Sequence, residues 1–322
     1  GRKGKGGFYR LNTSGGGKVK ESFKLRADGF NADTDYRPQE KVKLASFEAG
    51  KKGLRAVIES PDAGGKYARA VLFQTLAYAA SLVPEIADTI ADVDEAMRLG
   101  YNWKFGPFEM IDALGPKWFA DELRAQNRPV PPLLDAVGDG PFYRTTNGQL
   151  EYFGTDSAYH PITRADGVLL LRDIKRAGKP VHKGASASVW DIGDGVLCLE
   201  FTGKMNAIDD TVFEAIHTAI KLIGDGKTGP YKALVVYNEG DNFSAGANLG
   251  LALFAMNIAL WPQIDEMVAG GQRAYKALKY APFPVVGAPS GLALGGGCEI
   301  LLHCDHVQAH AETYVGLVEV GV

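Results

Sequence analysis

Two glycine-rich segments and two glutamates are the residues of this sequence whose types and spacing could do chemistry. The segments span residues 243–247 and 291–297, Glu299 lies one turn beyond the second, and Glu319 follows it. Small side chains at the entrance of a helix leave backbone N–H groups free to donate to a carbonyl oxygen. Two carboxylates can hold a water molecule and move its protons. Together these groups predict the addition of water to a double bond beside a thioester.

Each signal also has a purely structural explanation when it is taken alone. The N–H groups of Ala247 and Gly296 are the candidate donors, but Gly246 could serve only the backbone angles of a tight turn. The glycines before Glu299 could serve close packing, and Glu299 could be an exposed helix residue. Glu319, between two valines, could be a solvent-facing residue of an alternating segment. The combination, and no single residue, points to a catalytic site.

Composition gives room for roughly two domains of ordinary size and excludes several classes of protein. The hydrophobic content of 46% and the charged content of 23% are ordinary for a globular protein. A net charge of −3 gives no support for nucleic-acid binding. No run approaches the roughly 20 apolar residues of a membrane span, and the first residues do not resemble a signal peptide.

Cysteine usage predicts a reducing compartment, so we expect a cytoplasmic protein. There are three cysteines, Cys198, Cys298 and Cys304, too few for a disulfide framework in a chain of this length. His303 and His306 lie near two of them, but a Cys-x-x-Cys pair is missing. We therefore expect no metal site.

The first half reads as helical and the second as alternating strands and helices. Residues 1–60 are polar and glycine-rich, with turns or linkers expected at 15–17 and 61–65. Apolar periodicity predicts helices over 66–82, 86–99, 107–114 and 118–126. Residues 145–186 look like a connector with a strand-like piece at 168–171. Strands are expected at 196–201, 233–237 and 285–288, with a helix capped by Asp209 or Asp210 and stopped by Gly224. This alternation predicts a mostly parallel, layered sheet.

A short internal echo links the start of the chain to its middle. Residues 6–10 resemble residues 140–144, although chance could produce a match of five residues. If it is a true repeat, the chain begins at the end of one helical unit and then contains a second, complete one.

The second half resembles the crotonase (enoyl-CoA hydratase/isomerase) superfamily over residues 187–322. The residues that carry the resemblance are Ser244, Ala245, Gly246, Ala247, Gly291, residues 293–299, Cys304, Asp305, Gly316 and Glu319. The resemblance implies a ββα-spiral α/β fold and an oxyanion hole made by the N–H groups of Ala247 and Gly296. It further implies that Glu299 and Glu319 are the catalytic pair, and that the substrate is a CoA thioester hydrated without metal or cofactor. Ala245, Gly246 and Gly295 are then expected to bind substrate and CoA.

The match to that family has departures. Asn248 stands where an aspartate is usual, and Val318 stands where a proline usually precedes the second glutamate. The resemblance also places a further C-terminal portion, which caps the acyl pocket and supports trimers, beyond Val322. We therefore expect the crotonase domain to be incomplete at its C-terminus.

The helical block, residues 66–144, resembles the C-terminal domain of 3-hydroxyacyl-CoA dehydrogenases. The carrying residues lie at 92–100, 106–112 and 140–144. That resemblance puts the NAD-binding domain, the catalytic histidine and its glutamate partner upstream of Gly1. Dehydrogenase activity is therefore expected of a full-length parent and not of this chain alone.

These observations give one expectation for the whole chain. It would consist of residues 1–65 (the end of a preceding helical unit plus a linker), a helical domain at 66–144, a connector at 145–186 and a crotonase domain at 187–322. Its activity would be the reversible hydration of trans-2-enoyl-CoA in fatty-acid β-oxidation, within a bifunctional dehydrogenase/hydratase. The partners would be an acyl-CoA substrate and either further copies of the chain or a thiolase subunit. The alternatives are a non-catalytic acyl-CoA-binding or scaffold fragment, or an enoyl-CoA isomerase.

Overall fold

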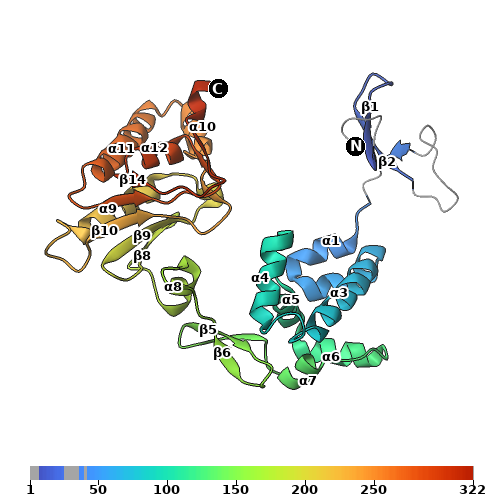
Figure 1. The fold of residues 1–322 in the computed structure, drawn as a ribbon. Coiled ribbons are helices and arrows are strands. Elements are labelled where there is room, and N and C mark those ends of the chain that lie inside the picture. The colour runs from blue at the N-terminus through green and yellow to red at the C-terminus, as the bar shows by residue number, and fades with distance from the viewer. Residues whose placement is uncertain (1–6, 25–35, 40–41, 322) are drawn as a thin grey trace. The chain divides into compact units, whose positions relative to one another are not determined.

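The structure, a computed structural model, describes residues 7–24, 36–39 and 42–321 (Figure 1). The chain forms two compact units: residues 1–142 with 153–158, and residues 143–152 with 159–322. Domain boundaries at residues 65, 144 and 186, expected from sequence, remain a proposal. Gly1, Gly6 and Val322, which those expectations invoke, lie outside the described residues.

The first unit is built on a bundle of short helices. Their bounds are α1 Ala45–Ala49, η1 Gly50–Lys52, α2 Leu54–Ile58, α3 Ala63–Ser81, α4 Ile90–Tyr101, α5 Pro107–Leu114, α6 Pro116–Ala125 and α7 Pro132–Val137. Phe73, Phe108 and Phe119 are fully buried between them, and the rings of Phe73 and Phe119 meet edge to face at 4.9 Å. Both α1 and α2 pack on α3, so helical packing begins in the region that was expected to be a linker.

Two helix starts differ from those expected. Residues 63–65 are the first turn of α3 and not a loop, because the Asp62 side chain accepts the N–H of Gly65 and caps the helix. The second helix begins at Ile90, four residues later than predicted, where Thr89 accepts the N–H of Asp92. It continues past Gly100 to a left-handed cap at Asn102. Capping side chains, rather than apolar spacing, set these ends.

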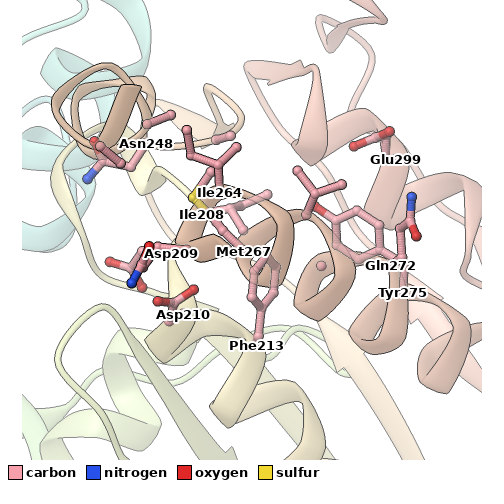
Figure 2. Close-up of a pocket in the computed structure, with 16 residues that line it drawn as sticks. Ile208, Asp209, Asp210, Phe213, Asn248, Ile264, Met267, Gln272, Tyr275 and Glu299 are labelled. Atoms are coloured by element: carbon pink, nitrogen blue, oxygen red, sulfur yellow. The ribbon is translucent and has the colours of Figure 1, made fainter. Parts of the chain in front are cut away.

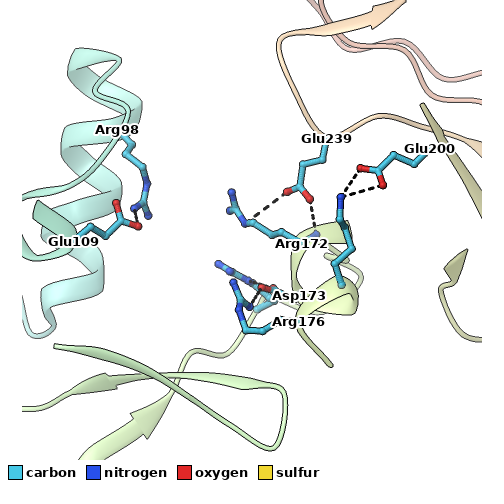
Figure 3. Close-up of polar contacts among 9 residues, drawn as sticks. Arg98, Glu109, Arg172, Asp173, Arg176, Glu200 and Glu239 are labelled. Carbon is cyan, nitrogen blue, oxygen red and sulfur yellow. Dashed lines mark hydrogen bonds and ion pairs between the residues drawn. The ribbon is translucent and has the colours of Figure 1, made fainter. Parts of the chain in front are cut away.

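A buried carboxylate joins α4 to α5. Asp94 is completely buried and accepts the N–H groups of Phe108 at 2.8 Å and Glu109 at 3.0 Å. Glu109 also accepts the N–H of Gly106 and forms an ion pair of 2.6 Å with Arg98 (Figure 3). These contacts satisfy the orphan N–H groups at the start of α5.

Two three-stranded sheets have the same order of strands. One contains β1 Tyr9–Asn12, β2 Val19–Phe23 and β3 Tyr36–Pro38, and the other contains β4 Tyr143–Thr146, β5 Gln149–Phe153 and β6 Tyr159–Pro161. The expected turn at residues 15–17 joins β1 to β2.

The side chains of these two sheets repeat as well as their strands. Arg10 pairs with Glu21 at 2.5 Å and stacks on Tyr36 at 4.0 Å. Arg144 likewise pairs with Glu151 at 2.6 Å and stacks on Tyr159 at 3.6 Å. The echo noted in the sequence therefore extends over three strands and an arginine held between a carboxylate and a ring.

A six-stranded sheet forms the centre of the second unit. Its strands, in spatial order, are β14 His306–Val307, β12 Val285–Gly287, β10 Ala233–Val236, β9 Val196–Phe201, β8 Ala187–Asp191 and β7 His182–Lys183. The four strands from β14 to β9 are parallel, with Leu234 aligned to Leu197 and Val285, and β8 and β7 are antiparallel. This confirms the mostly parallel sheet.

Two long helices cover this sheet. The first, α9 Asp210–Ile223, is capped by Asp209 and ended by Gly224, as predicted, and it packs on β8, β9 and β10. The second, α11 Trp261–Lys279, packs on α9, and α10 Leu249–Asn257 precedes it (Figure 1). Ile216, Ala274 and Leu278 are fully buried in the resulting core.

Residues 168–171 do not form the strand that was expected there. Residues 168–170 are irregular, and α8 Leu171–Ala177 begins there because Leu171 is buried against Trp190 and Cys198. Ion pairs fix α8: Lys175 reaches both oxygens of Glu200, and Arg172 reaches Glu239 (Figure 3). Tertiary burial and charge pairing thus override a β-like apolar run.

Candidate active site

Three parallel strands of a small separate sheet end at one place. They are β11 Asn242–Ser244, β13 Leu292–Leu294 and β15 Tyr314–Gly316, in the spatial order β11-β13-β15. The first glycine-rich segment begins in β11 and runs past its end, and the second contains β13 and runs past its end. Glu319 follows β15 in a short 3-10 turn, η3 Val318–Gly321. Ligands bind at the carboxyl ends of parallel strands because loops and helix starts converge there. All four predicted catalytic groups therefore belong to one edge.

The first loop is held by a buried hydroxyl. Ser244 Oγ is fully buried, donates to the carbonyl of Asn206 at 2.7 Å and accepts the N–H of Gly246 at 3.1 Å. Asn206 lies in η2 Lys204–Asn206, has φ of 51°, and its side chain donates to the carbonyl of Asn242. Asparagine tolerates this left-handed conformation better than most residues.

The second loop presses on the first with almost no side-chain atoms between them. Gly246 has φ of 91°, and a β-carbon there would lie 2.9 Å from the carbonyl oxygen of Leu294. A β-carbon at Gly297 would lie 2.8 Å from the Ser244 β-carbon. These glycines therefore do serve close packing, and that packing brings the two loops together.

This approach puts the two candidate donors side by side. A β-carbon on Gly296 would be 3.7 Å from the backbone nitrogen of Ala247. The neighbours of Ala247 use their own groups: Ile208 donates to the Gly246 carbonyl, and Asn248 donates to the Ile208 carbonyl. Among the described residues, neither the N–H of Ala247 nor that of Gly296 donates to a main-chain acceptor. Their use by a ligand oxygen remains a prediction.

The two carboxylates flank these donors. Glu299 lies in the first turn of α12 Gly296–Leu302 and is exposed. Glu319 is also exposed, in η3 and not in an alternating strand, and a β-carbon on Gly295 would lie 2.5 Å from its Oε1. Burial and the charges of Glu299 and Glu319 raise the pKa of the Cys298 thiol, so both carboxylates act on the same small region.

A cavity of about 450 Å³ opens beside these groups (Figure 2). Its wall is mostly apolar on the side of α10 and α11 and carries Glu299 at one end. The residues that line it are Ile208, Asp209, Asp210, Phe213, Ala247, Asn248, Ala252, Ala255, Gln263, Ile264, Met267, Val268, Gly271, Gln272, Tyr275 and Glu299. An apolar cavity with a few convergent polar groups is typical of a ligand site.

Not every predicted residue lines this cavity. Ala247 and Glu299 do. Gly296 and Glu319 are not among its lining residues, and Gly246 and Gly295 are buried in the contact between the loops. Ala245 is exposed, and its N–H donates to the carbonyl of Met205. The binding roles expected of Ala245, Gly246 and Gly295 remain predictions.

Tyr275 is a site residue that sequence reasoning missed. It lies on α11, lines the cavity with Ala247 and Glu299, and its hydroxyl lies 3.4 Å from the carbonyl oxygen of Gly296. No local sequence motif distinguishes Tyr275, because it lies near the C-terminal end of an ordinary amphipathic helix, just before Lys276 and Lys279. Only the packing of α11 on α9 and α12 brings it to the loops.

The described ranges contain neither a candidate cluster of metal-binding side chains nor a helix suited to cross a bilayer. There, no cluster of three or more His, Cys, Asp or Glu side chains is arranged to hold a metal ion. No helix in those same ranges has both the length and the apolar character that crossing a bilayer requires.

Family models match both halves of the chain. Residues 191–322 match the enoyl-CoA hydratase/isomerase family, and residues 65–162 match the 3-hydroxyacyl-CoA dehydrogenase C-terminal domain. The chain joins a dehydrogenase C-terminal domain to a crotonase domain. The resemblances seen in the sequence, and the order of helical and crotonase folds, are thereby confirmed.

Curated proteins resemble this chain over part or all of its length. A Bacillus subtilis protein named "Probable 3-hydroxyacyl-CoA dehydrogenase" is 35% identical over 296 residues, covering 89% of this chain and 37% of that protein. A Rickettsia felis protein named "Putative fatty acid oxidation complex trifunctional enzyme" is 31% identical over 100% of this chain and 40% of its own length. A "Crotonyl-CoA hydratase" of Syntrophomonas wolfei is 30% identical over 128 residues, covering 39% of this chain and 47% of that protein. The chain thus spans less than half the length of these relatives.

Proposed function

We propose that the crotonase domain catalyses the reversible hydration of trans-2-enoyl-CoA thioesters. The observation that carries the proposal is the convergence of two unpaired N–H groups and two carboxylates at the ends of β11, β13 and β15. A crotonase fold by itself is compatible with hydration or with double-bond isomerisation. Because two carboxylates are present, a water molecule could be held between them, and this favours hydration.

The chemistry follows from where charge develops. When the water oxygen bonds to C3, the electron pair of the double bond moves to C2 and the thioester oxygen, which becomes an enolate. The N–H groups of Ala247 and Gly296 would stabilise that oxygen, and loss of one such donor typically costs about 10²- to 10³-fold in rate. One glutamate takes a proton from the water as it attacks, and either glutamate can deliver a proton to C2, which completes the product.

The parent protein is proposed to be a bifunctional enzyme of fatty-acid β-oxidation. The names of the relatives support this, as does the match of residues 65–162 to the dehydrogenase C-terminal domain. NAD would serve the dehydrogenase part of such a parent, and hydration itself would need no cofactor. A cytoplasmic location, self-association and association with a thiolase subunit are further proposals for that parent. The repeat of β1–β3 in β4–β6 supports the proposal that residues 1–65 end a preceding helical unit.

The test is turnover of crotonyl-CoA, followed by the loss of enoyl absorbance. Glu299→Gln and Glu319→Gln should each lower kcat by about 10²-fold or more, because each removes a proton-transfer group. Glu312→Gln, an exposed glutamate between β14 and β15, is the matched control and should leave turnover unchanged. A crotonyl-CoA turnover that both glutamine variants retain would refute the assignment. Migration of the double bond in a 3-enoyl-CoA without hydration would establish the isomerase, and binding without turnover would establish an acyl-CoA-binding module.

A further inference from the structure

Tyr275 stands where the apolar part of the cavity meets the two donor loops. In Figure 2 its ring lies between the Met267 and Ile264 side of the cavity and Glu299. A β-carbon placed on Gly296 would lie 3.0 Å from its hydroxyl oxygen, so that hydroxyl approaches the main chain of the second loop. A tyrosine at such a boundary can present a polar atom to whatever occupies the cavity.

The ring of Tyr275 is fixed by its neighbours. It meets the Phe213 ring edge to face at 6.1 Å, and the His303 ring lies 5.5 Å from it. The His303 ring is itself anchored, because its Nδ1 lies 2.6 Å from the carbonyl oxygen of Glu299. The direction of the hydroxyl is therefore set by α9 and α12 and not by a free rotation of the side chain.

The hydroxyl is neutral and poorly paired. Burial, followed by the charges of Glu299 and Glu319, raises the pKa of Tyr275 well above its ordinary value, so it keeps its proton at neutral pH. Its contact with the Gly296 carbonyl, 3.4 Å, is longer than the 2.5–3.0 Å usual for an O–H···O hydrogen bond. A proton donor that lines the cavity and is only weakly bonded within the protein has capacity left for a ligand.

We propose that the Tyr275 hydroxyl binds the oxygen atom at C3 of the substrate, that is, the incoming water and then the 3-hydroxyl group of the product. This rests on the proposed hydration. The thioester oxygen is served by the Ala247 and Gly296 N–H groups, whereas the oxygen that is added must lie near the carboxylates that exchange its proton. Tyr275 lines the same cavity as Glu299, and its hydroxyl approaches Gly296, the neighbour of the Gly295 that Glu319 contacts. It would thus make the site selective for a thioester that bears a 3-hydroxyl.

The proposal is separable from a role of Tyr275 as a wall of the cavity. Tyr275→Phe keeps the ring that packs against Phe213 and His303 and removes only the hydroxyl. Tyr280→Phe is the matched control, because Tyr280 caps the same helix and is 75% exposed. Thermal unfolding of both variants checks that the fold is kept.

Two thioesters that differ only at C3 provide the decisive measurement. The dissociation constants of 3-hydroxybutyryl-CoA and butyryl-CoA are measured by calorimetry for the whole chain and its variants. In Tyr275→Phe the hydroxylated ligand should bind about 3- to 10-fold more weakly, as expected for one hydrogen bond, while butyryl-CoA binding stays the same. The kcat for hydration should fall about 10-fold with little change in the KM for crotonyl-CoA. Equal losses for both ligands, or no loss for either, would overturn the proposal.

The outcomes also separate this proposal from the proposed function. Suppose that the wild-type chain hydrates crotonyl-CoA, but Tyr275→Phe has the same ratio of dissociation constants for 3-hydroxybutyryl-CoA and butyryl-CoA as the wild type. The proposed role of Tyr275 is then rejected, and the proposed hydratase activity stands. Absence of hydration rejects the hydratase, and the affinity ratio still decides whether Tyr275 recognises a 3-hydroxyl. If Tyr275→Phe does not fold, the affinities of the wild-type chain provide the test. Equal dissociation constants for 3-hydroxybutyryl-CoA and butyryl-CoA would overturn the proposal.

Discussion

The carboxylate of Glu319 lies directly against the α-carbon of Gly295. Gly295 has φ of 52° and ψ of −123°, a conformation open to glycine, and its N–H donates to the carbonyl of Gly316 on β15. A β-carbon there would come within 2.5 Å of Glu319 Oε1. The N-cap residue of α12 and the proposed second carboxylate are thus in contact, so the position of one depends on the other.

Replacing Gly295 should therefore disturb Glu319 as well as the helix start. In Gly295→Ala the methyl group displaces the carboxylate, and the backbone strain costs about 1–3 kcal/mol. We expect kcat for crotonyl-CoA to fall about 10²-fold, the effect of misplacing a reacting group by about 1 Å. Gly240→Ala is the control, because a β-carbon there meets no atom within 4 Å. Equal kcat values for the two variants would contradict the contact.

The buried hydroxyl of Ser244 should prove important for both stability and activity. Ser244→Ala leaves the Gly246 N–H and the Asn206 carbonyl without their partner, which costs about 1–3 kcal/mol in the free energy of unfolding. Because Ala247 follows directly on this loop, kcat should fall as well. Urea unfolding and hydration kinetics measure the two effects. Ser244→Thr, which keeps a hydroxyl, should recover part of the activity if the hydrogen bonds are the cause.

Asp94 should control the stability of the helical unit. Asp94→Ala removes the acceptor of two N–H groups at the start of α5, where Asp94 is fully buried, and we expect a loss of about 2–4 kcal/mol. Thermal unfolding followed by circular dichroism would show it. Glu95→Ala, at the exposed next position, serves as control and should change the unfolding temperature little. Similar unfolding temperatures for the two variants would count against this role.

The cap of α9 should make part of the stability depend on pH. Burial opposes ionisation of Asp209, but hydrogen bonds from the Ser186 and Thr211 side chains and from the Val212 and Thr211 N–H groups outweigh it and lower the pKa of Asp209. A lowered pKa in the folded state means that the stabilisation is complete above about pH 4, the ordinary aspartate value, and is lost as pH falls further.

The matching variant is Asp209→Ala. It should be about 1 kcal/mol less stable than wild type at pH 7, the usual effect of losing a helix cap, and the difference should shrink below pH 4. Urea unfolding at pH 7 and at pH 3 measures it. A difference that stays constant between these two pH values would show that the charge of Asp209 contributes nothing.

Local signals predicted much of this fold, and long-range packing accounts for the rest. The ends of α9 were readable because Asp209 and Gly224 have intrinsic preferences for helix caps. The apolar run at 168–171 looked like a strand, yet the burial of Leu171 and the ion pairs of α8 decided otherwise. The contact of Ala247 with Gly296 could be expected from the family pattern. The position of Tyr275 depends on how α11 crosses α9 and α12, which no local window of sequence contains.

The arrangement of β11, β13 and β15 also makes the lengths of the chain segments important, apart from their residue types. Each of the three strands delivers one part of the site, and each residue of a strand advances the chain by about 3.3 Å. Inserting or deleting one residue between a strand and its functional group would shift that group relative to the groups on the other two strands. The shift would exceed the length of a hydrogen bond. Natural and engineered variation should therefore accumulate as changes of length in connections such as residues 224–232, while the segments 244–247, 294–299 and 316–319 keep a constant count.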